Sequence, residues 1–354
     1  MKEKLKYPVL ILVLSLSLCA AAIILHGCNS SAFNENESSS ETEITTTKPP
    51  EILNPLTGLP GYSADLLENR PVMIMINNIK ACRPQWGLTT PDIVFETVTE
   101  GGITRMLWMY ADKSLIPEKV GSVRSARHYY IQIARGFDAI FVHWGGSTYA
   151  YNEIRKGIID NIDGMSSGKY FDRDYSRGAS IEHTGFTTGS KIISAVSDKN
   201  YRTQIKEDYK NPFKFAKEKR SLAGGVCQTI NFSFSNNFSY SYKYNALDGL
   251  YYSYLNGDAF VDSKDNQQSF TNAVIIYANI SSLNDAKARV TLDFSGGKGV
   301  YVTNGTYENI TWKKGDDLSK LSFYSADGAE LLLNPGRSYI GIVPTDKESL
   351  TTLS

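Results

Sequence analysis

An apolar run from Pro8 to Leu25 follows a start with three lysines and ends in the tetrapeptide Leu-His-Gly-Cys at 25–28. A basic start, an apolar stretch and a small residue before the cleavage site are typical of a secretory signal peptide. The cysteine directly after that small residue is typical of a bacterial lipoprotein signal. Residues 1–28 are therefore predicted to be a lipoprotein signal peptide that leads to acylation of Cys28 by a fatty acid such as palmitate. An uncleaved membrane anchor is the alternative, because 18 mostly apolar residues only just span a bilayer. Both interpretations place the rest of the chain outside the cytoplasm.

The hydrophobic pattern stops over 29–50. This segment holds nine Ser or Thr and four Glu against Phe33 and Ile44 as large apolar residues. Such a composition cannot bury enough apolar surface to fold, so the segment is predicted to be a disordered tether.

From residue 51 the pattern changes to buried elements. Val72–Ile76 is a continuous apolar run, which is typical of a strand buried on both faces. Alternation over 92–99 and a return over 103–110 predict a hairpin around Gly101-Gly102. A helix is predicted over 122–135 with Ser122 or Ser125 as N-cap, then a strand over 139–144 and a helix capped by Ser147. This order favours an α/β domain over 51–220.

Period-two alternation begins after the polar, basic stretch that ends near Arg220. Ile230, Phe232 and Phe234 alternate, and so do the aromatic residues of 238–244. Turn dipeptides at 248–249, 256–257, 304–305 and 327–328 separate further strands predicted over 273–280, 299–303, 321–324 and 339–343. The overall class is therefore α+β, a mixed α/β domain followed by a β-rich domain over 226–345. Cross-strand packing is favoured over a sugar-binding platform for the aromatic ladder.

Charge and cysteine content narrow the picture further. The chain has 37 basic and 37 acidic residues, so no global field attracts nucleic acid. Cys82 and Cys227 could form one disulfide outside the cell. Two buried thiols are the favoured interpretation.

Several motifs occur in one order along the chain: Asn54-Pro-Leu-Thr-Gly-Leu, Ile76-Asn-Asn, Arg83-Pro-Gln-x-Gly-Leu, Asp92-Ile-Val-Phe-Glu, Glu100-Gly-Gly-Ile-Thr-Arg, Gly121-x-Val-Arg-Ser-Ala-Arg and Val142-His-x-Gly-Gly-Ser. In these motifs the chain resembles the YerB-like lipoprotein family of Gram-positive bacteria, which has an N-terminal and a C-terminal domain of unknown function. The resemblance implies a lipid-anchored protein on the extracytoplasmic face of the cell membrane. It implies no activity.

The predicted hairpin brings three charged residues together. With a two-residue turn at 101–102, Arg105 lies opposite Val98 and on the face that carries Glu96 and Glu100. The two carboxylates are roughly 13 Å apart along one strand, beyond the roughly 5.5 Å or 6.5–9.5 Å that glycosidases use. An ion-pair network is therefore favoured. Glu100 stays a candidate for catalysis, and Glu96 is a candidate ligand-binding residue.

Arginines at the start of the predicted 122–135 helix indicate an anion site. Residues 101–136 hold six Lys or Arg against two acidic residues. Exposed amides and forked guanidiniums at a helix start bind phosphate or carboxylate groups, so Arg124, Arg127 and Arg105 are candidate ligand-binding residues. An anionic wall polymer such as teichoic acid is the expected partner. Internal neutralisation by Glu96, Glu100 or Asp138 is the alternative.

Polar residues also follow two predicted strands. His143 is a candidate general base and Ser147 a candidate nucleophile or phosphate contact, and Asn77 and Asn78 are expected to line the same cleft. A core histidine, with Ser147 as helix cap, is favoured over catalysis, because no nucleophile elbow is present. Three widely spaced histidines remain after residue 28, so neither a metal nor a cofactor is predicted.

These features favour an envelope binding or scaffolding protein with an anion-binding cleft in its N-terminal domain. A hydrolase that acts on cell-wall glycans or phosphoesters is the alternative. A third possibility is a module that binds an envelope protein through the edges of its C-terminal strands.

Overall fold

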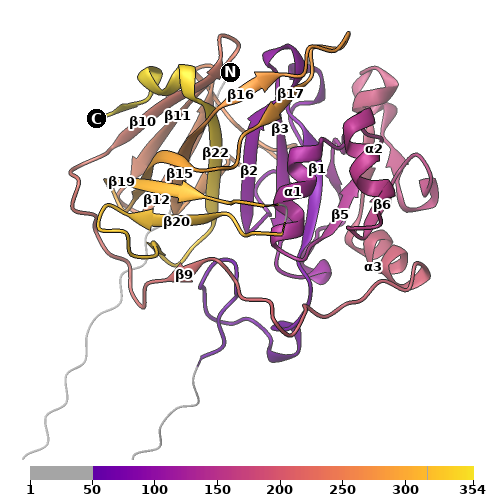
Figure 1. Cartoon of the computed structure of the whole chain (residues 1–354), viewed down its shortest axis with the longest axis horizontal. Helices are drawn as coiled ribbons and strands as arrows, with labels where there is room; N and C mark the ends of the chain where they lie inside the picture. Colours follow the sequence, from indigo (N-terminus) through magenta and orange to yellow (C-terminus); the bar gives the residue numbers. More distant parts are fainter. Residues whose placement is uncertain (1–50, 317) are drawn as a thin grey trace, which may run out of the picture. The chain divides into compact units, whose positions relative to one another are not determined.

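A ten-stranded mixed sheet forms the centre of the molecule (Figure 1). The computed structural model describes residues 51–354 with the exception of residue 317, so the predicted signal peptide, Cys28 and the tether lie outside the described residues. In spatial order the sheet consists of β20 (Ser322–Ser325), β19 (Thr306–Lys313), β18 (Gly297–Thr303), β15 (Asn272–Ala278), β22 (Ser338–Pro344), β2 (Ile93–Val98), β3 (Thr104–Tyr110), β1 (Val72–Asn77), β5 (Ile140–His143) and β6 (Asn161–Asp163).

A second sheet packs over the half of this sheet that the C-terminal region supplies. It contains β13 (Asp258–Ala259), β12 (Leu250–Leu255), β11 (Phe238–Asn245), β10 (Thr229–Ser235) and β23 (Thr352–Leu353), and β14 (Ser269–Phe270) pairs with β12. The smaller sheets are β16 (Ile280–Ser282) with β17 (Val290–Leu292), β21 (Leu332–Leu333) with β9 (Lys214–Phe215), and β4 (Val120–Gly121) with β8 (Gly185–Thr187) and β7 (Asp172–Arg173).

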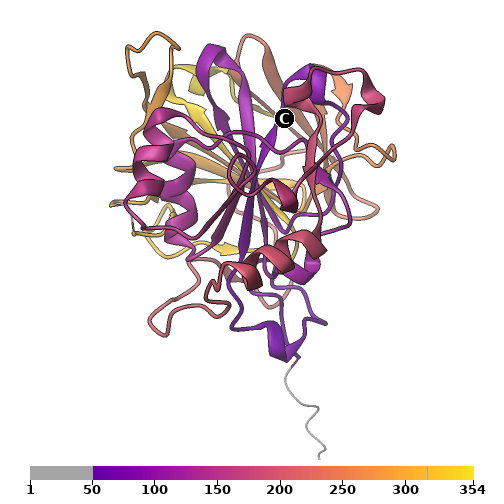
Figure 2. The same ribbon diagram turned by 90° about the vertical axis from the view of Figure 1, so that its right-hand side faces the viewer.

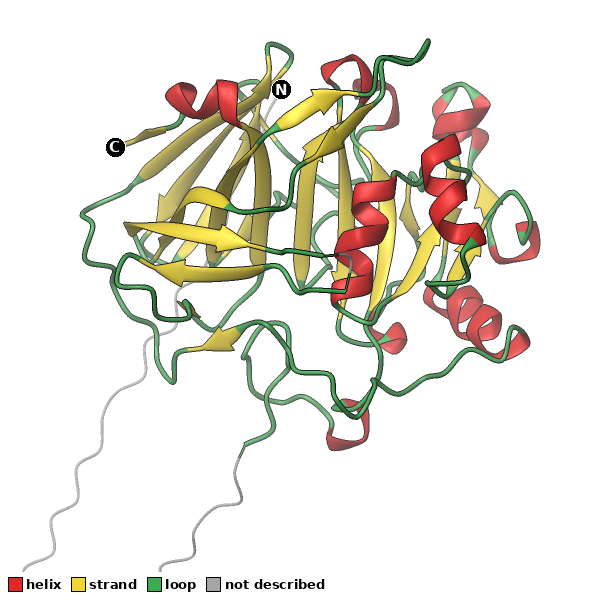
Figure 3. Ribbon diagram, viewed as in Figure 1, coloured by secondary structure: helices red, strands yellow, loops and turns green. Residues whose placement is uncertain are grey.

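The three described α-helices lie in the N-terminal part of the fold, and one 3₁₀ helix lies beside the C-terminus (Figure 3). The α-helices are α1 (His128–Gly136), α2 (Thr148–Arg155) and α3 (Gly189–Asp198), and the short 3₁₀ turns are Ala64–Leu66, Lys80–Cys82, Glu100–Gly102, Lys113–Leu115, Gly168–Tyr170, Tyr175–Arg177, Ile181–His183 and Thr345–Leu350. Figure 2 shows α1 and α2 together on one side of the fan of strands. Within the described part of the chain, no helix has the length and apolar character needed to span a membrane.

Both faces of β1 are buried, as the continuous apolar run at 72–76 predicts. Met73 and Met75 of β1 pack with the side chains of α1 on one face. Val72, Ile74 and Ile76 pack on the opposite face, in a core that also holds the aromatic side chains of β10 and β11. The alternation follows from the pleat of a strand, which directs successive side chains to opposite faces.

The prediction of a sheet-rich C-terminal region is confirmed. Phe232 pairs with Tyr240 across β10 and β11, and their rings stack with centroids 5.6 Å apart. Both rings are buried, which agrees with the cross-strand packing favoured for the aromatic ladder. The Asn304-Gly305 dipeptide joins β18 to β19 with positive φ at both residues, as a two-residue hairpin turn requires. Cys82 and Cys227 are buried thiols and do not form a disulfide with each other.

The two predicted domains share one sheet. β2 from the N-terminal region pairs in parallel with β22 from the C-terminal region, with Phe95 opposite Ile340. β15 then pairs in parallel with β22 on its other edge. The boundary expected near residues 220–226 therefore divides the sequence, but the central sheet contains hydrogen-bonded strands from both sides of it.

Candidate functional site

The register of the β2–β3 hairpin differs from the prediction and moves Arg105 away from Glu96. Arg105 pairs with Thr97, not with Val98 as predicted, and Glu96 pairs with Met106. The connection runs from Thr99 to Ile103 through a 3₁₀ turn, so the expected two-residue turn is wrong. Because a one-residue shift moves a side chain to the other face, Arg105 and Glu96 lie on opposite faces of the sheet.

Glu96 belongs to the polar centre of the core. Its carboxylate is fully buried and accepts hydrogen bonds from Asn78 (2.7 Å), Tyr240 (3.2 Å), Tyr339 (2.9 Å) and Thr104. Burial raises the pKa of Glu96, and the four hydrogen bonds partly oppose that rise. Glu96 and Asn78 thus hold the N-terminal strands against the C-terminal sheet.

Glu100 binds two arginines at the end of the hairpin. Nε of Arg127 donates to Oε2 at 2.8 Å and Nη2 of Arg127 donates to Oε1, while Nη2 of Arg105 donates to Oε1 at 3.3 Å. Burial alone would raise the pKa of Glu100. The hydrogen bond from Arg127 and the positive charges of Arg105 and Arg127 instead lower it to about 2. The predicted internal neutralisation therefore occurs through Glu100 and not through Glu96.

Arg105 is buried beside this pair. Burial, together with repulsion from Arg127, lowers the pKa of Arg105 to about 9, so the guanidinium stays charged at neutral pH. Its Nη1 donates to the carbonyl of Ser125 at 2.6 Å. Its Nε has no hydrogen-bond partner among the described residues.

The helix expected from residue 122 begins later. α1 starts at His128 with Arg127 as its N-cap residue in an extended conformation. The preceding backbone is held by other segments: the amide of Arg124 donates to Met75 at 2.9 Å, and that of Ala126 donates to Gly145 at 2.8 Å. These bonds compete with helix formation, so Arg124 and Arg127 do not lie in the first turn of a helix.

A pocket of about 320 Å³ lies next to the Glu100 arginines and shares Ser125 with them. Arg124, Arg173 and Glu182 line it. Arg124 donates to the Glu182 carboxylate at 2.7 Å and to its carbonyl at 3.1 Å. The Arg124 guanidinium on the pocket wall is thus paired with the Glu182 carboxylate of the same chain.

Trp144 also lines this pocket, and its side chain is half-buried. The guanidinium of Arg173 lies 4.1 Å from the ring centroid. A Cβ atom at Gly164 would come 2.6 Å from Cδ2 of the indole, and one at Gly185 would come 2.7 Å from Cε3. The ring therefore packs directly on glycine backbone and on the guanidinium of Arg173.

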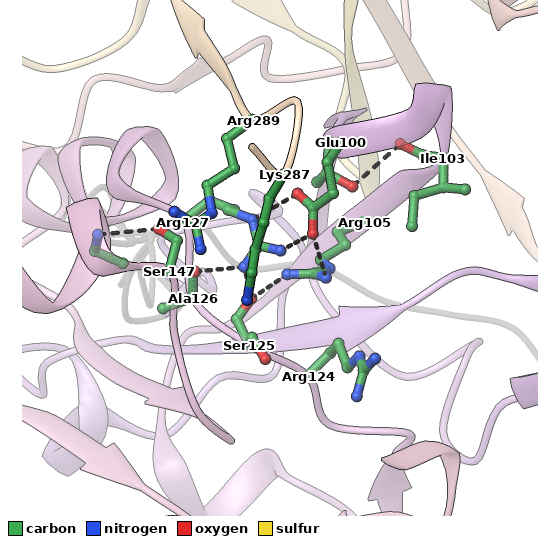
Figure 4. Close-up of polar contacts among 12 residues, drawn as sticks. Glu100, Ile103, Arg105, Arg124, Ser125, Ala126, Arg127, Ser147, Lys287 and Arg289 are labelled. Carbon is green, nitrogen blue, oxygen red and sulfur yellow. Dashed lines mark hydrogen bonds and ion pairs between the residues drawn. The ribbon is translucent and has the colours of Figure 1, made fainter. Parts of the chain in front are cut away.

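His143 and Ser147 have structural partners. His143, in β5, has no exposed surface, and its Nδ1 lies 2.8 Å from the carbonyl of Gly145 and its Nε2 3.1 Å from Oδ1 of Asn161. The Ser147 hydroxyl accepts from the amide of Ala150 at 3.1 Å and caps α2. Asn77 contacts His183, with Nδ2 3.1 Å from Nδ1. Of the predicted residues, Glu100, Arg105 and Arg127 come together beside the carbonyl of Ser125. Arg124 precedes Ser125 in the chain, but its side chain points away from them and pairs with Glu182 (Figure 4). The others do not join them.

Two basic residues at this place were missed by the sequence reasoning. Lys287 and Arg289 lie in the loop between β16 and β17, and in the view of Figure 4 they project toward Arg127 and Glu100. β17, which follows this loop, lies against α1, where His128 Nε2 is 3.0 Å from the hydroxyl of Thr291. Arg289 donates to Asp285 at 3.0 Å. No local sequence pattern links Lys287 and Arg289 to Arg127 and Glu100, because the two pairs lie far apart in the sequence.

Arg105, Arg124, Arg127, Lys287 and Arg289 are called the cationic cluster below. Their acidic partners are Glu100, Glu182 and Asp285. The five positive charges of the cluster thus exceed the three negative charges of these partners. Among residues 51–354, apart from 317, no group of three His, Cys, Asp or Glu side chains is arranged to hold a metal ion.

Comparison with known proteins gives matches over most of the chain. Residues 56–202 match the family described as "Protein of unknown function (DUF3048) N-terminal domain", and residues 229–340 match the corresponding C-terminal domain. A Bacillus subtilis (strain 168) protein named "Putative lipoprotein YerB" is 32% identical over 295 residues, which cover 82% of this chain and 86% of that protein. The fold is similar to the crystal structure of YerB protein from Bacillus subtilis, with a TM-score of 0.74 and 31% identity, over 86% of this chain and 100% of that one.

Proposed function

Because this chain belongs to the YerB-like lipoprotein family, as its motifs predicted, we propose that it is a lipid-anchored protein that binds an anionic polymer of the cell envelope. The cationic cluster is the proposed binding surface. The family is one of unknown function, and the name of the Bacillus subtilis relative describes a lipoprotein. Acylation of Cys28 would hold the folded body on the extracytoplasmic face, and the tether would let it reach the wall.

The observation that carries this proposal is the sharing of one carboxylate by two arginines. Arg105 and Arg127 both contact Glu100, so one of their two positive charges is not compensated there. Lys287 adds an exposed positive charge from the β16–β17 loop. Arg124 and Arg289 are half-buried, whereas Arg105 and Arg127 are buried. Phosphate and carboxylate groups are the partners that guanidiniums bind most strongly. A repeating polyanion would contact Lys287, Arg124 and Arg289, while the buried arginines would add to the positive potential of the surface.

Hydrolysis has less support than binding. A general base must reach the proton that it removes, and His143 is fully buried with a partner at each ring nitrogen. Glu100 is committed to two guanidiniums. Incubation of the protein with muropeptides and phosphoesters is therefore expected to give no turnover, and turnover lost in His143→Ala would favour the hydrolase instead.

A binding assay with a glycerol-phosphate polymer tests the proposal. The double variant Arg124→Ala, Lys287→Ala should bind the polymer at least about tenfold more weakly than the wild type, and wild-type binding should weaken with added salt. The matched control Lys217→Ala, Lys243→Ala removes two exposed positive charges elsewhere and should bind normally. Equal losses in both double variants would show unspecific attraction, and no binding by the wild type would refute the proposal.

The anchor has a separate test. Cys28→Ser should move the protein from the membrane fraction to the soluble fraction, because the acylated thiol is lost. Retention in the membrane fraction would favour the uncleaved anchor.

A further inference from the structure

A second pocket, of about 330 Å³, lies among four separate parts of the chain. Its walls come from the loop 54–62, from Thr90 and Asp92 before β2, from Leu115 after β3, and from Arg337 before β22. It shares no lining residue with the pocket beside Arg124. The loop is closed by a hydrogen bond from the amide of Asn54 to Leu59 at 2.8 Å, and Gly336 donates to Thr57 at 2.7 Å. The walls are therefore held by backbone bonds.

Asp92 and Arg337 bring opposite charges to this pocket. The Asp92 carboxylate accepts hydrogen bonds from the side-chain amide of Asn54 at 3.1 Å and the backbone amide of Ala111 at 2.8 Å, both uncharged. The Arg337 guanidinium donates to the carbonyls of Thr89 and Ser269, also uncharged.

These two half-buried charges have no ionic partner in the described part of the chain. Asp92 and Arg337 are close enough to influence each other's pKa, yet they form no ion pair with each other. Charged groups withdrawn from water usually pair with an opposite charge. A ligand bound in this pocket would give each of them an oppositely charged partner.

We infer that this pocket binds a small zwitterion, an amino acid or the end of a short peptide, with its ammonium group on Asp92 and its carboxylate on Arg337. A guanidinium presents a planar fork of donors that matches a carboxylate. The volume is near the lower end of the roughly 300–1,000 Å³ usual for ligand pockets, which limits the occupant to about the size of an amino acid. This site is independent of the proposed polymer-binding surface, because none of its residues belongs to the cationic cluster.

The protonation states agree with such a ligand. Burial raises the pKa of Asp92 to about 6, so its carboxylate is ionised above that pH and available to an ammonium group. Burial and the nearby carboxylates of Asp112, Asp92 and Asp65 raise the pKa of Tyr62. Tyr62, which lines the pocket, is therefore neutral, and its hydroxyl donates to the carbonyl of Leu66 at 3.4 Å. Binding of an amino acid should strengthen as the pH rises from 5 to 7.

The decisive experiment uses the unmodified full-length protein in detergent and ligands that differ in one charge. Saturation-transfer NMR should detect L-alanine, D-alanine or D-alanyl-D-alanine in contact with the protein. N-acetylalanine lacks the ammonium charge and alaninamide lacks the carboxylate, so each should bind at least about tenfold more weakly than alanine. Failure of all three zwitterions to bind, or equal binding of alanine and its two derivatives, would overturn the inference.

Two variants locate the site. Arg337→Gln should lose alanine binding, whereas Arg124→Ala should retain it, and circular dichroism should show both variants folded. Alanine binding that survives in Arg337→Gln would overturn the assignment. If Arg337→Gln does not fold, the comparison of alanine with its derivatives on the wild type decides alone. Failure of polymer binding with intact alanine binding would refute only the proposed function.

Discussion

The guanidinium of Arg127 holds the carboxylate of Glu100 with two hydrogen bonds, one of them 2.8 Å from Nε to Oε2. The pair joins the end of a hairpin to the start of α1, and Arg105 adds a third hydrogen bond to the same carboxylate. A paired carboxylate of this kind is important for stability only while it is ionised, which makes its contribution dependent on pH.

The pH dependence of stability should reveal the Glu100 pair. The pKa of Glu100 is lowered to about 2 from its usual value of 4.5. A lowered pKa gives stability that is complete above the pKa of the unfolded chain and is lost as the pH falls toward the folded value. We expect the free energy of unfolding to fall by about 2–3 kcal/mol between about pH 5 and pH 2 from this group. Urea denaturation across this range measures it.

Glu100→Gln should abolish this part of the acid sensitivity and lower stability at neutral pH, because two guanidiniums lose their charged partner. Glu118→Gln, at an exposed position, is the control and should keep the wild-type profile. An unchanged profile in Glu100→Gln would contradict the assignment.

Glu96 should act in the opposite direction. Its pKa is raised by burial, so its favourable contribution is present below the unfolded value of about 4.5 and is lost as the pH rises toward the folded value. Glu96→Gln keeps the shape of the side chain without a charge, and its stability relative to the wild type should increase as the pH rises from 4 to 8. Urea denaturation at several pH values tests this.

Glu96→Ala separates charge from hydrogen bonding. It leaves the hydroxyls of Tyr240 and Tyr339 without their buried acceptor, which should cost about 2–4 kcal/mol at any pH. If Glu96→Gln were destabilised as strongly as Glu96→Ala, an ionised carboxylate would be the group that the core requires.

Glu182 should compete with anionic ligands for Arg124. Its carboxylate lies 2.7 Å from Nη2 of Arg124 and is half-exposed, so its removal should change stability by less than about 1 kcal/mol. Glu182→Ala should strengthen binding of the glycerol-phosphate polymer by roughly twofold to fivefold. The double variant Arg124→Ala, Glu182→Ala should bind like Arg124→Ala alone, and weaker binding in Glu182→Ala would show that the carboxylate is part of the receptor.

The packing of Trp144 on glycine should make the pocket wall intolerant of a methyl group. Gly164→Ala would place Cβ 2.6 Å from the indole ring, and the resulting overpacking should cost about 1–3 kcal/mol. Gly168→Ala is a matched control in the same region, because nothing lies within 4 Å of its added Cβ. Thermal unfolding of the two variants compares them, and equal melting temperatures would show that Trp144 can move aside.

Several elements could be predicted because their signals are local. The apolar run at 72–76 indicated a strand with both faces buried, and Ser147 indicated the helix that it caps. The alternating aromatic residues after 229 indicated paired strands, since period-two burial is a property of each strand alone. The two buried cysteine thiols also agreed with the favoured interpretation.

The hairpin register and the start of α1 could not be predicted in this way. The connection between β2 and β3 is longer than the Gly-Gly pair suggests, and this difference turned Arg105 away from Glu96. Residues before His128 prefer hydrogen bonds to Met75 and Gly145 over a further helical turn. Both outcomes depend on partners far away in the sequence.

The amino-acid sequence by itself determined the family and the alternation of apolar residues, because each of these depends on neighbouring residues. The lipoprotein signal is likewise a prediction from local sequence. Tertiary structure decided which charges meet. Arg105 and Arg127 share Glu100, Lys287 approaches from a distant loop, and Asp92 faces a pocket with Arg337, because strand pairing and loop closure set the distances between side chains. Electrostatic interactions depend on those distances and on burial, and neither quantity can be read from sequence spacing.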